Sequence, residues 1–92
     1  MTGGTTKTAL VSGATRGIGL EISTLLARQG YALTLTARDA ERLDAVAVEL
    51  RAAGAADIVT VAADMADGDD IERVLGAHAE RFGIMSALIL NA

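Results

Sequence analysis

The sequence predicts an α/β fold with a doubly wound parallel sheet. Four short apolar runs alternate with three longer segments of helical periodicity, and no proline, low-complexity linker or block of like charge interrupts the alternation. Parallel strands joined through helices need crossover connections, which are right-handed in nearly all proteins. The predicted order is therefore βαβαβαβ. The chain of 92 residues is long enough for one small domain at most.

The apolar runs have the length and composition of buried parallel strands, which carry aliphatic residues on both faces. Aromatic residues are nearly absent, and Ala, Val, Leu and Ile fill the predicted interior instead. This composition is typical of helices packed on a parallel sheet. We expect strands at residues 7–12, 31–37, 58–63 and 86–90.

The first predicted helix begins near Ile18 and is ended by Gly30. Apolar residues recur in it at the spacings i, i+4, i+7 and i+8, which place them on one helical face. We expect this face to be the buried one. Its members are Ile18, Ile22, Leu25 and Leu26.

The second helix starts after Asp39, a favourable N-cap residue, and is closed by Gly54. Its predicted apolar face consists of Leu43, Val46, Ala47 and Leu50. The third helix covers residues 67–82 and is ended by Gly83. Its stripe consists of Ile71, Val74, Leu75 and His78, with the histidine expected at the boundary of the core.

Composition and charge exclude several classes of function. The formal net charge of −4 argues against nucleic acid or an anionic membrane surface as a partner, since both require a basic patch. There is no cysteine and only one histidine, so thiolate metal sites are excluded and most zinc arrangements are disfavoured. No secretion signal or membrane-spanning apolar run is evident. We therefore expect a cytoplasmic protein.

A glycine-rich turn, Ser12-Gly13-Ala14-Thr15-Arg16-Gly17-Ile18-Gly19, joins the first strand to the first helix. Gly13 permits a tight exit from the strand, Gly17 lets bare backbone approach an anion, and Gly19 lets the helix pack closely on the sheet. Free N–H groups at the helix start would then face a phosphate. Glycines taken alone also mark ordinary turns, which is the alternative interpretation.

Four connections fall at the carboxyl ends of the predicted strands, where ligands of such sheets bind. They are residues 13–19, 37–38, 64 and 91–92. The pattern Gly13-x-x-x-Gly17-x-Gly19, with Asp64 after the third strand and Asn91-Ala92 after the fourth, resembles the short-chain dehydrogenase/reductase family. The resemblance runs along essentially the whole chain and implies a Rossmann-like fold.

The resemblance also implies roles for single residues. The backbone from Thr15 to Ile18 would hold the pyrophosphate of a dinucleotide cofactor. Asp64 would bind the adenine amino group with the backbone of Met65 beside it, and Asn91 and Ala92 would lie near a cofactor ribose. One departure is visible, because Leu90 stands where the family has the first asparagine of its Asn-Asn-Ala-Gly motif. Hydrogen bonds in that loop must then come from elsewhere.

The residues at the end of the second strand indicate NADP(H) rather than NAD(H). Proteins that prefer NAD place a carboxylate there for the ribose 2′-hydroxyl, whereas this chain has Ala37 followed by Arg38. Arg16 in the glycine turn can reach the same region, and paired guanidinium groups suit a 2′-phosphate. Two alternatives are a solvated surface role for Arg38 and a ribose contact from Asp39, which is better explained as a helix cap.

No catalytic residue is expected in this segment. Enzymes of the family use a Ser and a Tyr-x-x-x-Lys pair beyond the Asn-Ala motif, and neither Tyr31 nor Lys7 stands in such a position. The resemblance implies that residues 1–92 are the N-terminal part of one NAD(P)-binding domain. The parent enzyme would interconvert a small carbonyl compound and an alcohol, as a homo-oligomer; the segment alone would be inactive. The alternatives are a stand-alone dinucleotide-binding module or sensor, and an incomplete product that needs partner chains.

Overall fold

Seven elements alternate along the chain in the predicted βαβαβαβ order. They were located in a computed structural model, which describes residues 6–91. The strands are β1 (Thr8–Ser12), β2 (Ala32–Ala37), β3 (Asp57–Ala62) and β4 (Ala87–Ile89). The helices are α1 (Gly17–Arg28), α2 (Ala40–Ala53) and α3 (Gly68–Phe82). Element bounds differ from the predicted ones by one or two residues at most sites, which is the usual uncertainty of element ends.

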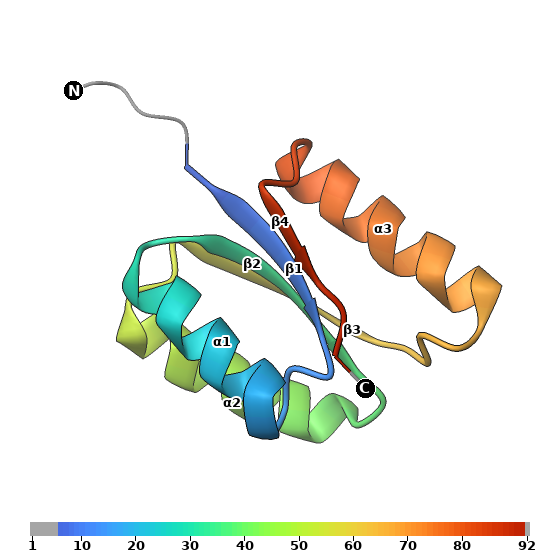
Figure 1. Ribbon diagram of the computed structural model, residues 1–92, viewed down its shortest axis with the longest axis horizontal. Helices are drawn as coiled ribbons and strands as arrows, with labels where there is room; N and C mark the ends of the chain where they lie inside the picture. The colour runs from blue at the N-terminus through green and yellow to red at the C-terminus, as the bar shows by residue number, and fades with distance from the viewer. Residues whose placement is uncertain (1–5, 92) are drawn as a thin grey trace.

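The four strands form one parallel sheet in the order β3-β2-β1-β4. The chain builds outward from β1 to β2 and β3, and then returns to place β4 on the other side of β1 (Figure 1). The direction of the winding therefore reverses between β1 and β4. This confirms the doubly wound sheet and puts its switch point beside the glycine turn.

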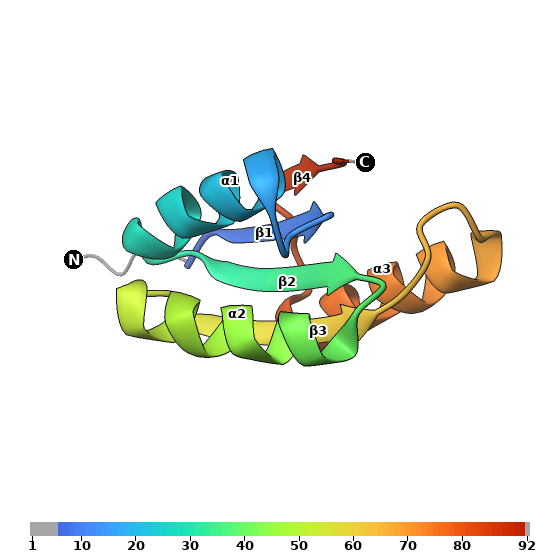
Figure 2. The same ribbon diagram turned by 90° about the horizontal axis from the view of Figure 1, so that it is seen from below.

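Helices cover the two faces of the sheet unequally. α1 and α2 lie on one face and α3 lies on the other, as the two views in Figure 1 and Figure 2 show. The larger core lies under α1 and α2, where Leu33 and Leu35 of β2 pack with Leu43 and Leu50 of α2. All four predicted apolar residues of α2 are buried, so that stripe is confirmed.

The predicted buried face of α1 is wrong for Ile18 and Leu25, whereas Leu26 is partly buried and packs against the core. Ile18 and Leu25 are 65% and 56% exposed, and the residues that face the sheet are Gly19, Ser23 and Ala27. These small residues follow the spacing i, i+4, i+8, so the helical period was correct and its phase was not. A β-carbon on Gly19 would collide with the carbonyl oxygen of Gly13. The start of the helix therefore packs so close to the first turn that no side chain fits at Gly19.

The predicted N-cap of α2 is confirmed, and α3 has an N-cap of the same type that was not predicted. The Asp39 carboxylate accepts the backbone N–H of Arg42 at 3.2 Å, and the Asp67 carboxylate accepts the backbone N–H of Asp69 at 2.8 Å. His78 is fully buried rather than at the boundary of the core. Its Nδ1 lies 2.7 Å from the Thr34 hydroxyl oxygen. This hydrogen bond to β2 offsets the cost of burying a polar side chain.

Within residues 6–91, none of the helices combines the length and the apolar composition needed to cross a bilayer.

Candidate functional site

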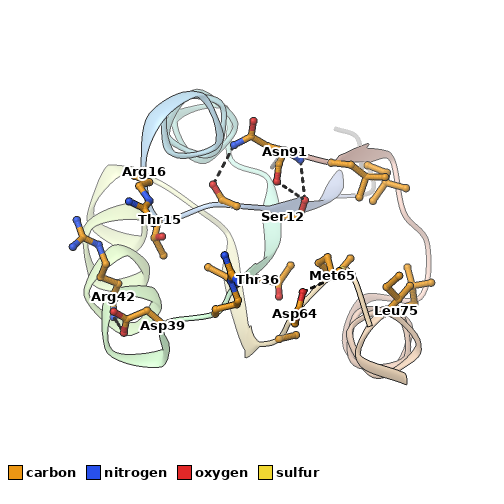
Figure 3. A pocket seen from close by; sticks show the side chains of 18 residues that line it. Ser12, Thr15, Arg16, Thr36, Asp39, Arg42, Asp64, Met65, Leu75 and Asn91 are labelled. Atoms are coloured by element: carbon orange, nitrogen blue, oxygen red, sulfur yellow. Dashed lines mark hydrogen bonds between the residues drawn. The ribbon is translucent and has the colours of Figure 1, made fainter. Parts of the chain in front are cut away.

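An open cavity of about 980 Å³ lies at the carboxyl ends of the strands (Figure 3). The glycine turn, the β2–α2 connection, the β3–α3 connection and the end of β4 all contribute to its wall, as predicted for the four strand ends. Its lining residues are Ser12, Gly13, Thr15, Arg16, Thr36, Ala37, Arg38, Asp39, Arg42, Ala63, Asp64, Met65, Ala66, Ile71, Leu75, Leu88, Leu90 and Asn91.

The conformation of the glycine turn favours glycine at two positions, Gly13 and Gly17. Gly13 has φ +61°, and a β-carbon there would lie 2.6 Å from the carbonyl oxygen of Asn91. Gly17 has φ +58° but no atom within 4 Å of the position of a β-carbon. Gly13 is therefore constrained by backbone and by packing, whereas Gly17 leaves open space at the first turn of α1.

The N-terminus of α1 has no side-chain cap, unlike those of α2 and α3. Its N-cap residue is Arg16, whose side chain makes no capping hydrogen bond, and its first turn contains no acidic residue. The first backbone bond into the helix is donated by Leu20 to the Arg16 carbonyl at 3.3 Å. The earlier N–H groups of a helix lack intrahelical acceptors, and a basic residue opposes the helix dipole unless an anion binds there. The backbone N–H groups at this end of α1 are thus available to an anion.

The end of β4 is tied to the glycine turn by Ser12 and Asn91. The Asn91 backbone N–H donates to the Ser12 hydroxyl at 2.9 Å, and this hydroxyl is 3.3 Å from the Asn91 carbonyl oxygen. The Asn91 side-chain amide points to the Gly13 carbonyl oxygen at 3.5 Å. Ser12 thus supplies hydrogen bonds to the backbone of this loop, where the side chain of Leu90 can make none, and Leu90 itself is 68% exposed in the cavity wall.

One side of the cavity carries three arginines from three different elements. Arg16 occupies the N-cap position of α1 without capping it, Arg38 follows β2, and Arg42 lies in the first turn of α2. Sequence reasoning predicted the first two and missed Arg42. The sequence does contain a signal for Arg42, which is its position three residues after the predicted N-cap Asp39. A residue at that position lies in the first helical turn, and its side chain leans toward the helix start.

The other side of the cavity is formed by the β3–α3 connection and by apolar residues. Asp64 and Met65 lie there as predicted, and the Asp64 carboxylate accepts the backbone N–H of Ala66 at 2.9 Å. The apolar lining from α3 and β4 was not predicted: Ile71, Leu75, Leu88 and Leu90. The cavity therefore pairs a cationic side with an acidic and apolar side.

Asp70 and Arg73 of α3 hold the connection that carries Asp64. The Asp70 carboxylate accepts the backbone N–H of Asp64 at 2.8 Å, and Arg73 donates both to that carboxylate at 3.3 Å and to the Ala62 carbonyl at 2.8 Å. The N–H of Asp64, and then Arg73, lower the pKa of Asp70, because they stabilise its ionised form more than partial burial disfavours it. Asp70 and Arg73 thus fix the backbone on both sides of Ala63.

Asp70→Asn is expected to lower the free energy of unfolding at neutral pH. A carboxyl whose pKa is lowered by folding contributes stability above its unfolded pKa of about 3.9, and this contribution is lost as the pH falls through the folded value. The stability difference between wild type and variant should therefore be constant above about pH 5 and shrink below about pH 4. Urea unfolding across this pH range measures it.

Asp69→Asn is the matched control, because Asp69 lies in the same helical turn and its carboxylate accepts no hydrogen bond within residues 6–91. A stability difference between wild type and Asp70→Asn that is the same at pH 7 and at pH 3 would contradict the assignment.

Of the predicted site residues, seven line the cavity: Gly13, Thr15, Arg16, Arg38, Asp64, Met65 and Asn91. Gly17, Ile18 and Gly19 form the first turn of α1 beside it and are not part of its wall. Ala92 lies outside the described residues. The structure therefore brings together residues from four separate connections, whereas the first turn of α1 lies beside the cavity and not in its wall.

The side-chain hydroxyl of Thr36 is exceptional among the residues that the structure describes. It is buried at the end of β2, in the wall of the cavity, and has no hydrogen-bond partner within residues 6–91. Figure 3 shows Thr36 between Asp64 and the side that carries Thr15 and Arg16. An unpaired buried hydroxyl costs stability, and such groups in native folds call for an explanation such as a binding site.

The short chain dehydrogenase family matches residues 7–92 of this chain. The chain belongs to that family. A 3-oxoacyl-[acyl-carrier-protein] reductase, FabG, of Staphylococcus aureus is 38% identical over 88 residues, which are 95% of this chain and 35% of the relative. The short-chain resemblance seen in the glycine turn, Asp64 and Asn91 is confirmed at the level of the family.

Solved structures agree with the fold. The alcohol dehydrogenase of the archaeon Thermococcus sibiricus, complexed with 5-hydroxy-NADP, superposes with a TM-score of 0.85 at 37% identity, over 90% of this chain and 35% of that one. The L-sorbose reductase of Gluconobacter frateurii, complexed with NADPH and L-sorbose, gives a TM-score of 0.90 at 31% identity, over 96% and 34%. This short-chain dehydrogenase sequence thus spans about a third of the length of its relatives.

Proposed function

We propose that these residues form the adenosine half of an NADP(H) site in a longer short-chain oxidoreductase, which interconverts a carbonyl compound and an alcohol by hydride transfer. One observation carries the choice of cofactor. Arg16 and Arg38 line the cavity where β2 ends in Ala37, and a protein that prefers NAD would have a carboxylate at that strand end. Two solved relatives hold NADPH or 5-hydroxy-NADP, which supports this choice.

The residues present fit such a cofactor. The uncapped start of α1 and the open space at Gly17 suit a pyrophosphate, which would take hydrogen bonds from the backbone of Thr15, Ile18 and their neighbours. The close contact of Gly19 with Gly13 leaves no room for a side chain between the turn and the helix. An anion bound here is stabilised by the α1 dipole and by Arg16.

The remaining roles follow the walls of the cavity. Asp64, held in place by Asp70, would accept a hydrogen bond from the adenine amino group, and the backbone of Met65 would lie beside the ring. Asn91 and Ala92 would lie near a ribose. Because the Asn91 amide points to Gly13, its first task is to hold the glycine turn in shape.

Bound NADPH would supply the hydride to a carbonyl compound, and bound NADP+ would accept it from an alcohol. No residue of this segment is assigned a catalytic role, and we propose that the serine, tyrosine and lysine of the family stand in the rest of the enzyme. On this proposal residues 1–92 are the N-terminal part of one NAD(P)-binding domain. A small-molecule substrate, a homo-oligomeric assembly and a cytoplasmic location are part of the same proposal.

Binding of NADPH and NADH to the intact protein tests the proposal. Titrations followed by calorimetry should give a dissociation constant for NADPH at least about tenfold below that for NADH, since the 2′-phosphate adds charge-assisted hydrogen bonds. Equal affinities, or tighter binding of NADH, would contradict the assignment of the cofactor. Oxidation of bound NADPH by a panel of carbonyl compounds separates an oxidoreductase from a binding module or sensor, which would show binding without turnover.

A further inference from the structure

We propose that Arg42 is a third residue that binds the 2′-phosphate of the cofactor and contributes to the choice of NADP(H) over NAD(H). The inference rests on the proposed function and adds a residue that lies on another element. Arg42 belongs to α2, whereas Arg16 and Arg38 belong to the glycine turn and the end of β2.

The arginines of this chain fall into two groups. Arg51, Arg73 and Arg81 are engaged by the protein itself: they donate to the Ile58 carbonyl, to Asp70 and to Asp57, respectively. Arg16, Arg38 and Arg42 line the cavity, and within residues 6–91 their guanidinium groups make no hydrogen bond or ion pair. Of the four arginines without a protein partner within residues 6–91, three thus line the cavity, and the fourth, Arg28, lies in the last turn of α1.

The position of Arg42 is fixed by the start of α2. Its backbone N–H is held by the Asp39 carboxylate at 3.2 Å, so the first turn of the helix is anchored at the cavity. Side chains in a helix lean toward its N-terminus, which directs Arg42 toward the β2–α2 connection. In Figure 3, Arg42 and Arg16 lie on the same side of the cavity, with Thr15 beside Arg16.

Charge explains what this group of arginines binds. Three guanidinium groups that line one cavity carry like charges, which repel one another when no anion lies between them. Asp39, at the same wall, offsets one positive charge only in part. A phosphate monoester carries up to two negative charges and three acceptor oxygens, so it can receive hydrogen bonds from more than two arginines. A ribose hydroxyl offers no such charge.

The test uses two ligands that resemble the adenosine half of the cofactor. Adenosine 2′,5′-bisphosphate carries the 2′-phosphate, and adenosine 5′-diphosphate does not. In the intact protein, Arg42→Ala is expected to weaken binding of the first about tenfold and to leave binding of the second within about twofold. The effect on the first should shrink at high salt. Arg42→Lys, which keeps the charge but not the planar fork, should lose less than Arg42→Ala.

Arg28→Ala is the matched control, since it removes the same charge from the last turn of α1, outside the cavity wall. The Arg42 side chain has no protein partner within residues 6–91, so Arg42→Ala should unfold at the same temperature as the wild type. If Arg42→Ala is less stable, binding of the two ligands is compared between Arg42→Lys and the wild type instead. If the wild type binds the bisphosphate and Arg42→Ala binds it equally well, the role of Arg42 is overturned and the proposed function stands. If the wild type does not bind the bisphosphate, the proposed function itself fails.

Discussion

Replacing Arg38 by alanine is expected to weaken the binding of NADPH about 10- to 100-fold and to leave the binding of NADH within about threefold. Arg38 lies directly after β2, at the edge of the cavity where Ala37 leaves no competing carboxylate. Hydrogen bonds from a guanidinium to a phosphate are charge-assisted and can be bidentate. NADH lacks the 2′-phosphate, so it loses little when the arginine is removed.

The measurement is a pair of titrations on wild type and variant of the intact protein, with NADH as the control for the shape of the site. Arg28→Ala controls for the loss of one positive charge, because it lies at the far end of α1 from the glycine turn. An unchanged ratio of the two affinities in Arg38→Ala would show that Arg38 is a solvated surface charge, which is the alternative reading of this residue.

Two Gly→Ala substitutions in helices are expected to change stability in opposite directions. Gly19→Ala should lower the free energy of unfolding by about 3 kcal/mol, because the new methyl group would overlap the Gly13 carbonyl oxygen and force α1 away from the turn. Gly76→Ala should raise it by about 0.5 to 1 kcal/mol, because Gly76 lies inside α3 with no atom within 4 Å of the new methyl group.

Urea unfolding of the intact protein measures both changes, and Gly76→Ala serves as the control for the helix propensity of alanine. The loss in Gly19→Ala is a large fraction of the 5–15 kcal/mol by which a domain is typically stable, so the variant should also show weaker binding of NADPH. Equal stabilities of Gly19→Ala and wild type would mean that the contact between α1 and the glycine turn does not limit the packing of the helix.

Local patterns in the sequence determined most of the fold. The alternation of apolar runs with helical periods predicted all seven elements in the correct order. Asp39 is a cap in the structure as well, since a cap depends on backbone groups only two or three residues away. The four connections at the cavity were predicted for a similar reason, because the carboxyl ends of parallel strands necessarily meet at one edge of the sheet.

Other features depended on contacts between distant residues. The buried face of α1 consists of Gly19, Ser23 and Ala27, and hydrophobicity alone could not show that a close approach to Gly13 favours small residues over Ile18. The burial of His78 depended on a hydroxyl in β2, which the helical pattern of α3 does not contain.

The sequence by itself determined which elements form, where their caps lie and which strand ends meet, because these follow from backbone periodicity and neighbouring residues. Only the tertiary structure decided which residues hold the glycine turn and which third arginine lines the cavity beside Arg16 and Arg38. Ser12 binds Asn91 across 79 positions because β4 returns to the side of β1, and Arg42 joins Arg16 because α2 begins at the same cavity. The glycine turn is thus recognisable in the sequence, whereas the partners that hold it and the third arginine follow from the order of the strands.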